Sequence, residues 1–278
     1  MDAKPLTSAP QAPHDGEPPL LRERRGSVAL LTLNRPKARN SLSENLLRAL
    51  GEAIDDIAAS PDTHAIVLTG APPAFCAGHD LREMSARRGD PDGGRAYFES
   101  LMRLCSSVMQ KVVLSPKPVI AAVSGIATAA GCQLVASCDL AVAGESSRFA
   151  TPGVNIGLFC STPMVALSRN LGRKQAMEML LLGEMILAAR ALEFGLLNRV
   201  VPDAQVLEAA LALADQIASK SPLVLRIGKE AFYAQAEMPM REAYDYASRV
   251  MAENLMARDA EEGIGAFLEK RAPRWQGC

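Results

Sequence analysis

Short apolar strand patterns alternate with helical patterns through the first half of the chain. The strand patterns cover residues 27–33, 65–69, 119–123 and 139–143. Between them, apolar residues recur at helical spacing after Ser43, a typical helix N-cap, and again over residues 94–114. Strands that alternate with helices pair in parallel through right-handed crossovers. The sequence therefore predicts an α/β protein built on a parallel sheet.

The second half of the sequence is almost entirely helical in pattern. Helical spacing recurs near residues 162–171, 173–182, 188–194, 203–219, 221–236, 240–257 and 259–270. Only residues 196–201 interrupt it, as a possible strand. With 278 residues, 49% of them apolar, the chain can bury a sizeable core. We expect a sheet-bearing core followed by a helical C-terminal region.

The first 19 residues are rich in Pro and Ala and are predicted to form a flexible tail. They lack the apolar segment of a secretory signal, and their acidic residues and lack of arginine argue against a transit peptide. Several of the cysteines lie in apolar runs, which is typical of free thiols in a reducing compartment. We therefore expect a cytoplasmic protein.

One uncharged stretch, residues 119–138, resembles a membrane span in length. It nevertheless contains two glycines and Ser, Thr and Gln side chains, and a proline directly precedes it. A strand followed by a buried helix explains these features better than a single membrane-spanning helix does. We expect no membrane span.

The overall charge and the spacing of the metal-binding residue types exclude other classes. A net charge of −1 argues against nucleic acid, whose binding proteins usually carry a positive excess, and aromatic residues for base stacking are few at 4%. Six cysteines and three histidines form no Cys-x-x-Cys pair or other zinc-binding spacing. No metal site and no nucleic acid partner are expected.

Two turns rich in small residues could approach a ligand closely. In FCAGHDL, Gly78 permits unusual backbone angles, so that the N–H of His79 can point into a cleft. In TAAGCQL, small residues begin a helix whose first N–H groups are free. Two such donors aimed at one point form an oxyanion hole, which stabilises a carbonyl that gains negative charge. Tight packing of a helix on a strand explains the same small residues equally well.

Common hydrolase and nucleotide-binding signatures are missing. The sequence has no G-x-S-x-G elbow, no Walker loop, no H-E-x-x-H and no G-x-G-x-x-G. His79 is the only histidine near either small-residue turn, and a lone loop histidine is more often structural than a general base.

The order of the motifs identifies a family. NRPKARNSLS, AFCAGHDLREM, the block from KPVIAAV to GVNIGL, the block from GRKQAMEM to LLNRVVP, and EGIGAFLEKRAP follow one another along the chain. Together they resemble the crotonase superfamily, the enoyl-CoA hydratase/isomerase family, from about residue 20 to residue 275.

The resemblance implies an α/β fold with a β/α spiral core of repeated ββα units over residues 20–200. It also implies a helical region over residues 201–278 that makes trimers, or hexamers as dimers of trimers. The expected ligand is an acyl-CoA thioester, so that coenzyme A is part of the substrate and no separate cofactor is needed. The implied chemistry is that of a lyase or an isomerase in fatty acid metabolism.

The resemblance also assigns residues to the site. The backbone N–H groups of His79 and Ala130 would form the oxyanion hole around the thioester carbonyl. The RPKAR turn and the AGHDLR loop would hold the CoA nucleotide and its pantetheine arm, and the C-terminal helix of a neighbouring subunit would approach the adenine. The substrate-binding residues implied in this way are Lys37, Arg39, Ala77, Asp80, Leu81, Arg82 and Lys270.

The sequence departs from the family at the proton-carrying positions. Gln133 and Gly153 stand where hydratases have their two glutamates, and Ser161 stands where dienoyl-CoA isomerases have an aspartate. An amide can hydrogen-bond a substrate or a water but cannot shuttle protons as a carboxylate does. Ordinary enoyl-CoA hydration is therefore expected to be weak or absent.

Two readings of function stay open. In the first, the protein is an enzyme that stabilises a thioester enolate. Another group then transfers the proton: His79, Asp80, Cys160, Ser161, or a water held by Gln133. A malonyl-type acyl-CoA decarboxylase is one such enzyme, because the substrate's own carboxylate makes an external base less necessary. In the second reading, the protein is a non-catalytic acyl-CoA-binding or regulatory protein.

Overall fold

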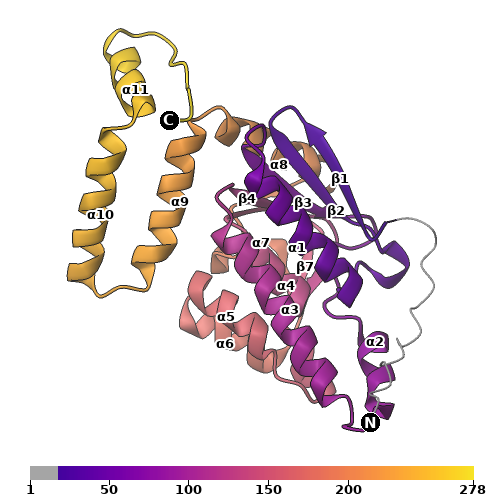
Figure 1. The fold of residues 1–278 in the computed structure, drawn as a ribbon. Coiled ribbons are helices and arrows are strands. Elements are labelled where there is room, and N and C mark those ends of the chain that lie inside the picture. Colours follow the sequence, from indigo (N-terminus) through magenta and orange to yellow (C-terminus); the bar gives the residue numbers. More distant parts are fainter. Residues whose placement is uncertain (1–17) are drawn as a thin grey trace, which may run out of the picture.

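The computed structural model describes residues 18–278, so that the predicted tail lies outside the described residues except for Pro18 and Pro19. The described chain is a mixed α/β structure in which helices cover both faces of a central sheet and a helical arm projects to one side (Figure 1).

The main sheet has six strands in the order β1-β2-β3-β4-β6-β9. These strands are β1 (Leu20–Arg25), β2 (Val28–Leu33), β3 (Ala65–Gly70), β4 (Val119–Val123), β6 (Leu140–Gly144) and β9 (Arg199–Val201). In this sheet β2, β3, β4, β6 and β9 run parallel to one another, and β1 pairs antiparallel with β2. The predicted parallel sheet is confirmed, with one antiparallel edge strand added.

A second, smaller sheet of three short strands lies in the order β5-β7-β8. It consists of β5 (Ile126–Thr128), β7 (Arg148–Ala150) and β8 (Ile186–Leu187). Each of β5 and β7 follows a main-sheet strand and precedes a helix, which gives the expected ββα units. Because β5 ends at Thr128, it delivers the chain directly to one of the small-residue turns.

The helices of the core lie close to their predicted positions. They are α1 (Glu44–Ala59), α2 (Leu81–Ala86), α3 (Arg95–Leu114), α4 (Ala130–Ser137), α5 (Ser161–Asn170), α6 (Arg173–Leu182), α7 (Ala188–Phe194) and α8 (Val206–Ala218). Short 3₁₀ helices cover residues 36–38, 87–89, 152–156 and 203–205. Ser43 caps α1 as predicted, because its side chain accepts a hydrogen bond from the Leu46 N–H.

Alternate residues of the central strands face two separate cores. On one side, Ile66 and Leu68 of β3 pack with α1, α3 and α4. On the other side, Ala65 and Val67 pack beneath α8. Strands buried on both faces read as continuous apolar runs, which explains why β2, β3 and β4 were detected from the sequence.

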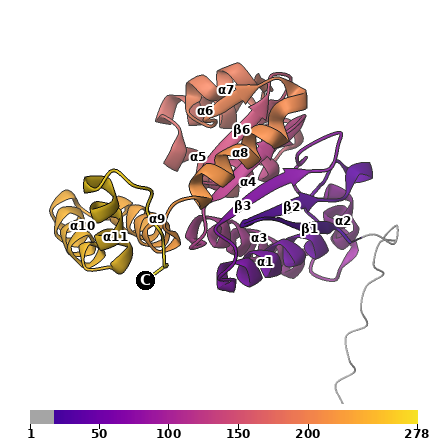
Figure 2. The same cartoon turned by 90° about the horizontal axis from the view of Figure 1, so that it is seen from above.

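The arm consists of α9 (Pro222–Ala236), α10 (Met240–Leu255) and α11 (Arg258–Leu268). Figure 2 shows these three helices standing apart from the rest of the molecule, whereas α8 lies on the sheet. Neither α9 nor α10 has a fully buried residue. Among residues 18–278, no helix is long and apolar enough to cross a membrane, and the uncharged stretch divides into β4, β5 and α4.

Candidate active site

Main-chain hydrogen bonds hold the two small-residue turns side by side. Cys76 pairs with Ala127 in a short parallel bridge. In this bridge the Cys76 N–H donates to the Ile126 oxygen at 3.1 Å, and the Thr128 N–H donates to the Cys76 oxygen at 2.9 Å. The loop that leads to His79 is therefore attached to the strand that leads to Ala130.

Gly78 lies directly against the second turn. A Cβ atom at Gly78 would lie 2.9 Å from the Cβ of Ala129 and 3.5 Å from the nitrogen of Ala130. Gly78 also has φ +94°, a left-handed conformation that favours glycine. The glycine is thus required twice, by its backbone angles and by the close approach of the neighbouring turn.

The backbone N–H groups at the two turns are available to a ligand. Ala129 has φ 50° and ψ −118°, a strained conformation for a residue with a side chain, and it directs the chain into α4. Within residues 18–278, neither the N–H of His79 nor that of Ala130 donates to a protein acceptor. Ala130 is the first residue of α4, so that the positive end of the helix dipole also lies here.

His79 is partly exposed, but both nitrogens of its imidazole are buried. Neither ring nitrogen makes a hydrogen bond to any described residue. Burial lowers the pKa of His79, and the backbone of Leu42 offsets part of that effect. The ring is therefore neutral at pH 7.

Asp80 is committed to structure rather than free to transfer protons. Its Oδ1 caps α2 by accepting from the N–H groups of Arg82 and Glu83. Its Oδ2 accepts from the guanidinium of Arg35 at 2.8 Å. Burial alone would raise the pKa of Asp80, but hydrogen bonds from Arg35, Glu83 and Arg82 outweigh it and lower the pKa.

The same ion pair removes Arg35 from the expected phosphate-binding set. Its guanidinium also donates to the Ser41 carbonyl at 2.6 Å, and its side chain is only 18% exposed. Asn40, fully buried, fixes the turn by donating to the carbonyls of Ala71 and Ala74. No local pattern indicates the contacts with Asp80, Ala71 and Ala74, because these residues are distant along the chain from Arg35 and Asn40.

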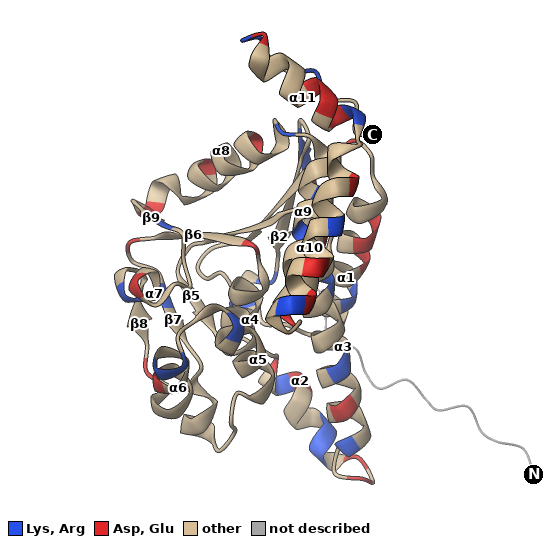
Figure 3. Ribbon diagram, turned by 90° about the vertical axis from the view of Figure 1, so that its left-hand side faces the viewer, with Lys and Arg blue, Asp and Glu red and all other residues tan. Residues whose placement is uncertain are grey.

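The remaining basic residues of the turn and the loop face solvent. Lys37, Arg39 and Arg82 are exposed, and Figure 3 shows basic positions along α2. The turn and the loop are joined by a hydrogen bond from the Ala77 N–H to the Arg39 oxygen at 3.0 Å. Leu81 is 50% exposed at the start of α2 and adds an apolar surface beside these cations.

Gln133 lies one helical turn after Ala130, on the same face of α4. Its residue is only 4% exposed, and its Oε1 has no hydrogen-bond partner. A buried polar atom without a partner costs about 1–3 kcal/mol, so that such atoms commonly mark a place where a ligand or water binds. Gln133 is thus buried in the first half of α4 and has an unused acceptor.

The space around Gly153 is filled by the chain that follows it. A Cβ atom at Gly153 would lie 2.6 Å from the Leu158 oxygen and 2.9 Å from the sulfur of Cys160. Ser161 is exposed, and its hydroxyl donates to the Phe159 carbonyl at 3.4 Å. There is therefore no room for a side chain at residue 153. The backbone conformation is not the obstacle, because the φ angle of Gly153 lies outside the left-handed region.

Lys270 follows α11, on the projecting arm, and is exposed. Figures 1 and 2 show α11 and α2 at opposite ends of the molecule. Lys270 of the same chain therefore does not join Arg39 and Arg82.

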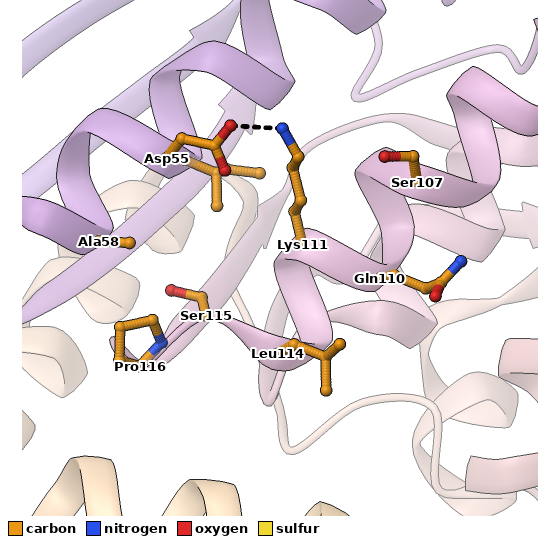
Figure 4. Close-up of a pocket in the computed structure, with 9 residues that line it drawn as sticks. Asp55, Ala58, Ser107, Gln110, Lys111, Leu114, Ser115 and Pro116 are labelled. Atoms are coloured by element: carbon orange, nitrogen blue, oxygen red, sulfur yellow. Dashed lines mark hydrogen bonds and ion pairs between the residues drawn. The ribbon is translucent and has the colours of Figure 1, made fainter.

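A separate surface pocket of about 360 Å³ lies between α1 and α3 (Figure 4). Asp55 and Lys111, which both line this pocket, form an ion pair with each other. None of its lining residues belongs to the candidate site, and none leaves a buried polar side-chain atom unpartnered. In the described part of the chain, no three His, Cys, Asp or Glu side chains group to hold a metal ion.

The amino-acid sequence matches the enoyl-CoA hydratase/isomerase family over residues 23–278. The chain belongs to this family. Enoyl-CoA hydratase domain-containing protein 3, mitochondrial, from Rattus norvegicus is 45% identical over 272 residues, which cover 98% of this chain and 89% of the rat protein. The family expected from the sequence motifs is confirmed.

Solved structures of enoyl-CoA hydratase/isomerase family members confirm the crotonase fold. A crystal structure of an enoyl-CoA hydratase from Mycobacterium smegmatis superposes with a TM-score of 0.89 at 51% identity, covering 93% of this chain and 99% of that one. The crystal structure of human enoyl-CoA hydratase domain-containing protein 3 has a TM-score of 0.87 at 46% identity. It covers 92% of this chain and 100% of the human one.

The relatives within the family contradict the expected cytoplasmic localisation. The rat and human relatives are named as mitochondrial proteins, which points to mitochondria rather than the cytoplasm. The expectation was wrong because it relied on the composition of the first 19 residues and on the free cysteines, and neither identifies a compartment. A targeting segment is an address read by a receptor, and composition alone is a weak guide to it.

Proposed function

We propose that the protein binds an acyl-CoA thioester and stabilises its enolate with the backbone N–H groups of His79 and Ala130. The observation that carries the proposal is the pair of unused N–H donors on two turns that touch at Gly78. Negative charge that develops on a thioester oxygen is stabilised by donors that are already oriented. The strain at Ala129 supports a functional role, because strained backbone clusters at active sites.

The proposed enzyme is a poor hydratase. Hydration needs a base that activates water and an acid that protonates the α-carbon, and each contributes about 10²–10⁴-fold. Gln133 and Gly153 cannot fill these roles, and Asp80 is held by Arg35 and by the α2 N-terminus. A reaction in which the enolate forms by loss of a substrate carboxylate, as in a malonyl-type decarboxylase, fits this site better because it needs no external base.

The CoA part of the ligand is proposed to lie along the RPKAR turn and α2. Arg39 and Arg82 are exposed, and Arg39 is held next to the loop by its hydrogen bond with Ala77. Arg39→Ala should weaken binding of CoA itself by about tenfold, and more at low salt, because one charge-assisted contact contributes about 1.5 kcal/mol. Isothermal titration calorimetry with CoA tests this, and unchanged affinity would refute the assignment.

Acetoacetyl-CoA offers a direct test of enolate stabilisation, because its enolate has its own ultraviolet absorbance. Oriented donors at His79 and Ala130 should favour the enolate over the keto form of the bound ligand. Titration of the protein into acetoacetyl-CoA at neutral pH should therefore increase the enolate absorbance. A non-catalytic acyl-CoA-binding protein would bind the ligand with an unchanged spectrum, and that result would contradict the proposal.

The arm is proposed to assemble the protein into a trimer or a hexamer. It exposes many large apolar side chains: Phe232, Met240, Tyr244, Met251, Leu255, Met256, Ile264, Phe267 and Leu268. Removing such surface from water is worth about 25 cal/mol per Å². The same assembly would bring Lys270 of one subunit towards the CoA site of another.

Light scattering at micromolar concentration tests the assembly. The expected mass is three or six times 29.6 kDa. Phe267→Glu, on a side chain that is 82% exposed in the single chain, should shift the population towards monomers. A stable wild-type monomer would contradict the assembly.

A further inference from the structure

The sulfur of Cys160 occupies the space that a side chain at residue 153 would need. It lies 2.9 Å from the Cβ position that Gly153 lacks. Gly153 is one of the two positions where a carboxylate is missing, so that a different protonatable group lies there. Ser161, the neighbouring residue, is exposed and bonded to the Phe159 carbonyl.

Cys160 also lies close to the helix that carries Ala130 and Gln133. It directly precedes α5, which packs against α4. Burial raises the pKa of Cys132, in the first turn of α4, to about 12, and the nearby Cys160 adds to this rise. Gln133, the residue after Cys132 on α4, has a buried and unpartnered Oε1, which is a second, independent sign that a ligand or water binds at this helix.

We propose that the Cys160 thiol is the proton donor to the α-carbon of the thioester enolate, in place of the missing residue-153 carboxylate. This inference rests on the proposed enolate chemistry and names the group that completes it. Cys160 is 8% exposed, so that its thiol is largely shielded from solvent.

The proton transfer balances without a co-reactant. The S–H bond breaks, the electron pair of the enolate forms the new C–H bond at the α-carbon, and Cys160 is left as a thiolate. Burial raises the pKa of Cys160, which keeps it protonated at neutral pH, and the backbone of Gly153 offsets part of this rise. Water then returns a proton to the sulfur.

Affinity labelling with bromoacetyl-CoA tests the placement of the thiol. This reagent carries a bromide on the carbon that corresponds to the α-carbon of an acyl-CoA. Attack by the Cys160 sulfur forms a C–S bond, releases bromide and gives the thiol proton to solvent. Peptide mass spectrometry of the wild-type protein should find Cys160 alkylated as the thioether Cys–S–CH2–C(O)–S–CoA, with at least tenfold less adduct in the presence of excess butyryl-CoA.

The exposed Cys278 is an internal control, because butyryl-CoA should not protect it. Protected labelling of Cys132 or His79 instead of Cys160 would overturn the role of Cys160 while leaving acyl-CoA binding intact. A third outcome is that no residue shows labelling that butyryl-CoA blocks and that calorimetry detects no binding of butyryl-CoA. That outcome would overturn the proposed function together with the role of Cys160. Binding without any protected label overturns the role of Cys160 alone.

Exchange of the α-protons of butyryl-CoA with D₂O tests proton transfer itself, because a donor in one direction is the acceptor in the reverse direction. In Cys160→Ser, the exchange rate measured by NMR should fall by about a hundredfold, within the usual range for one acid–base group. Butyryl-CoA affinity should stay within about twofold. Cys105→Ser, a buried cysteine of α3, is the matched control and should exchange at the wild-type rate. An equal rate in Cys160→Ser would overturn the proposal.

Discussion

At the scale of single residues, two backbone positions create the site. Gly78 and Ala129 both have positive φ angles and lie against each other, and each precedes a residue whose N–H donates to no acceptor among the described residues. Gly78 was recognised from the sequence, since glycine is the residue that such angles favour. The strain at Ala129 was not recognised, because an alanine in the sequence does not indicate which backbone conformation its neighbours impose on it.

Gly78→Ala should separate binding of the thioester group from binding of CoA. The added Cβ would meet Ala129 at 2.9 Å and force the two turns apart. We expect affinity for butyryl-CoA to fall by about tenfold or more, because loss of one oriented donor typically costs about 2.7–4 kcal/mol in the transition state and less in the ground state. Affinity for free CoA should change little, as calorimetry would reveal.

Gly26→Ala is the matched control for this substitution. Gly26 has φ +60° but no atom within 4 Å of its missing Cβ. Backbone strain should therefore lower the free energy of unfolding of both variants. Only the Gly78 variant should also lose affinity for the thioester. Equal affinities for butyryl-CoA in the two variants would contradict the contact between the turns.

The Arg35–Asp80 pair predicts a defined pH dependence of stability. The net effect of burial and of its hydrogen bonds is to lower the pKa of Asp80, so that the folded state favours the carboxylate. Its contribution is therefore complete above the ordinary aspartate pKa and is lost as the pH falls through the lowered pKa. Urea unfolding of wild type and Asp80→Asn should differ at pH 7, and the difference should shrink below about pH 4. A difference that grows on acidification would contradict this sign.

At the scale of elements, a buried ion pair joins the arm to the core. Lys229 of α9 donates to Asp139 at 2.7 Å and to the carbonyls of Val112 and Lys117. Tyr233 donates to the other carboxylate oxygen of Asp139 at 2.9 Å. Since Asp139 follows α4, this contact fixes both the arm and the far end of the helix that begins at Ala130.

Lys229→Met should destabilise the protein strongly. The variant leaves Asp139 partly buried without its cation, and removing one partner of a buried pair costs about 3–5 kcal/mol. Lys229 is 7% exposed in its side chain and Asp139 is 18% exposed, which favours the lower end of that range. Lys220→Met, on an exposed lysine between α8 and α9, should change the free energy of unfolding by less than about 0.5 kcal/mol. Denaturant unfolding that gives similar values for both variants would refute the anchor.

The elements that the sequence predicted are those with strong local signals. The buried strands β2, β3, β4 and β6 are continuous apolar runs, and the long helices have clear helical periodicity. Strand β1 was missed because it is an edge strand with five of its six residues exposed, so that no apolar run marks it. Strands β5, β7 and β8 have only two or three residues each and depend on pairing with distant segments.

The candidate site shows the same division between local and distant information. The small-residue turns are visible in the sequence itself, and so are Gln133 and Gly153 at the positions where the resemblance leads us to expect glutamates. The commitment of Arg35 to Asp80, and the place of Cys160 beside Gly153, depend on residues brought together by folding. Space rather than backbone angle is what prevents a glutamate at residue 153, which no local pattern reveals.

At the scale of the whole molecule, the candidate site and the exposed apolar arm lie in different parts of the fold. His79 lies in the loop between β3 and α2 and Ala130 lies where β5 leads into α4, both in the core, whereas many of the exposed apolar residues lie on the arm. Figure 1 shows the arm projecting away from α2 and the loops around it. The proposed oxyanion hole therefore needs only one chain, whereas the proposed contact of Lys270 with CoA would need a neighbouring chain.

Hydration of crotonyl-CoA by the purified wild-type protein tests the central claim most directly. An oxyanion hole without carboxylates predicts turnover lower than that of an ordinary hydratase by about 10⁴ or more. Gln133→Glu should raise the rate, because residue 133 already lies beside Ala130, whereas Gly153→Glu should fail to do so for lack of space. Wild-type turnover in the ordinary range of about 1–10³ s⁻¹ would mean that another residue replaces both glutamates, and would contradict this account.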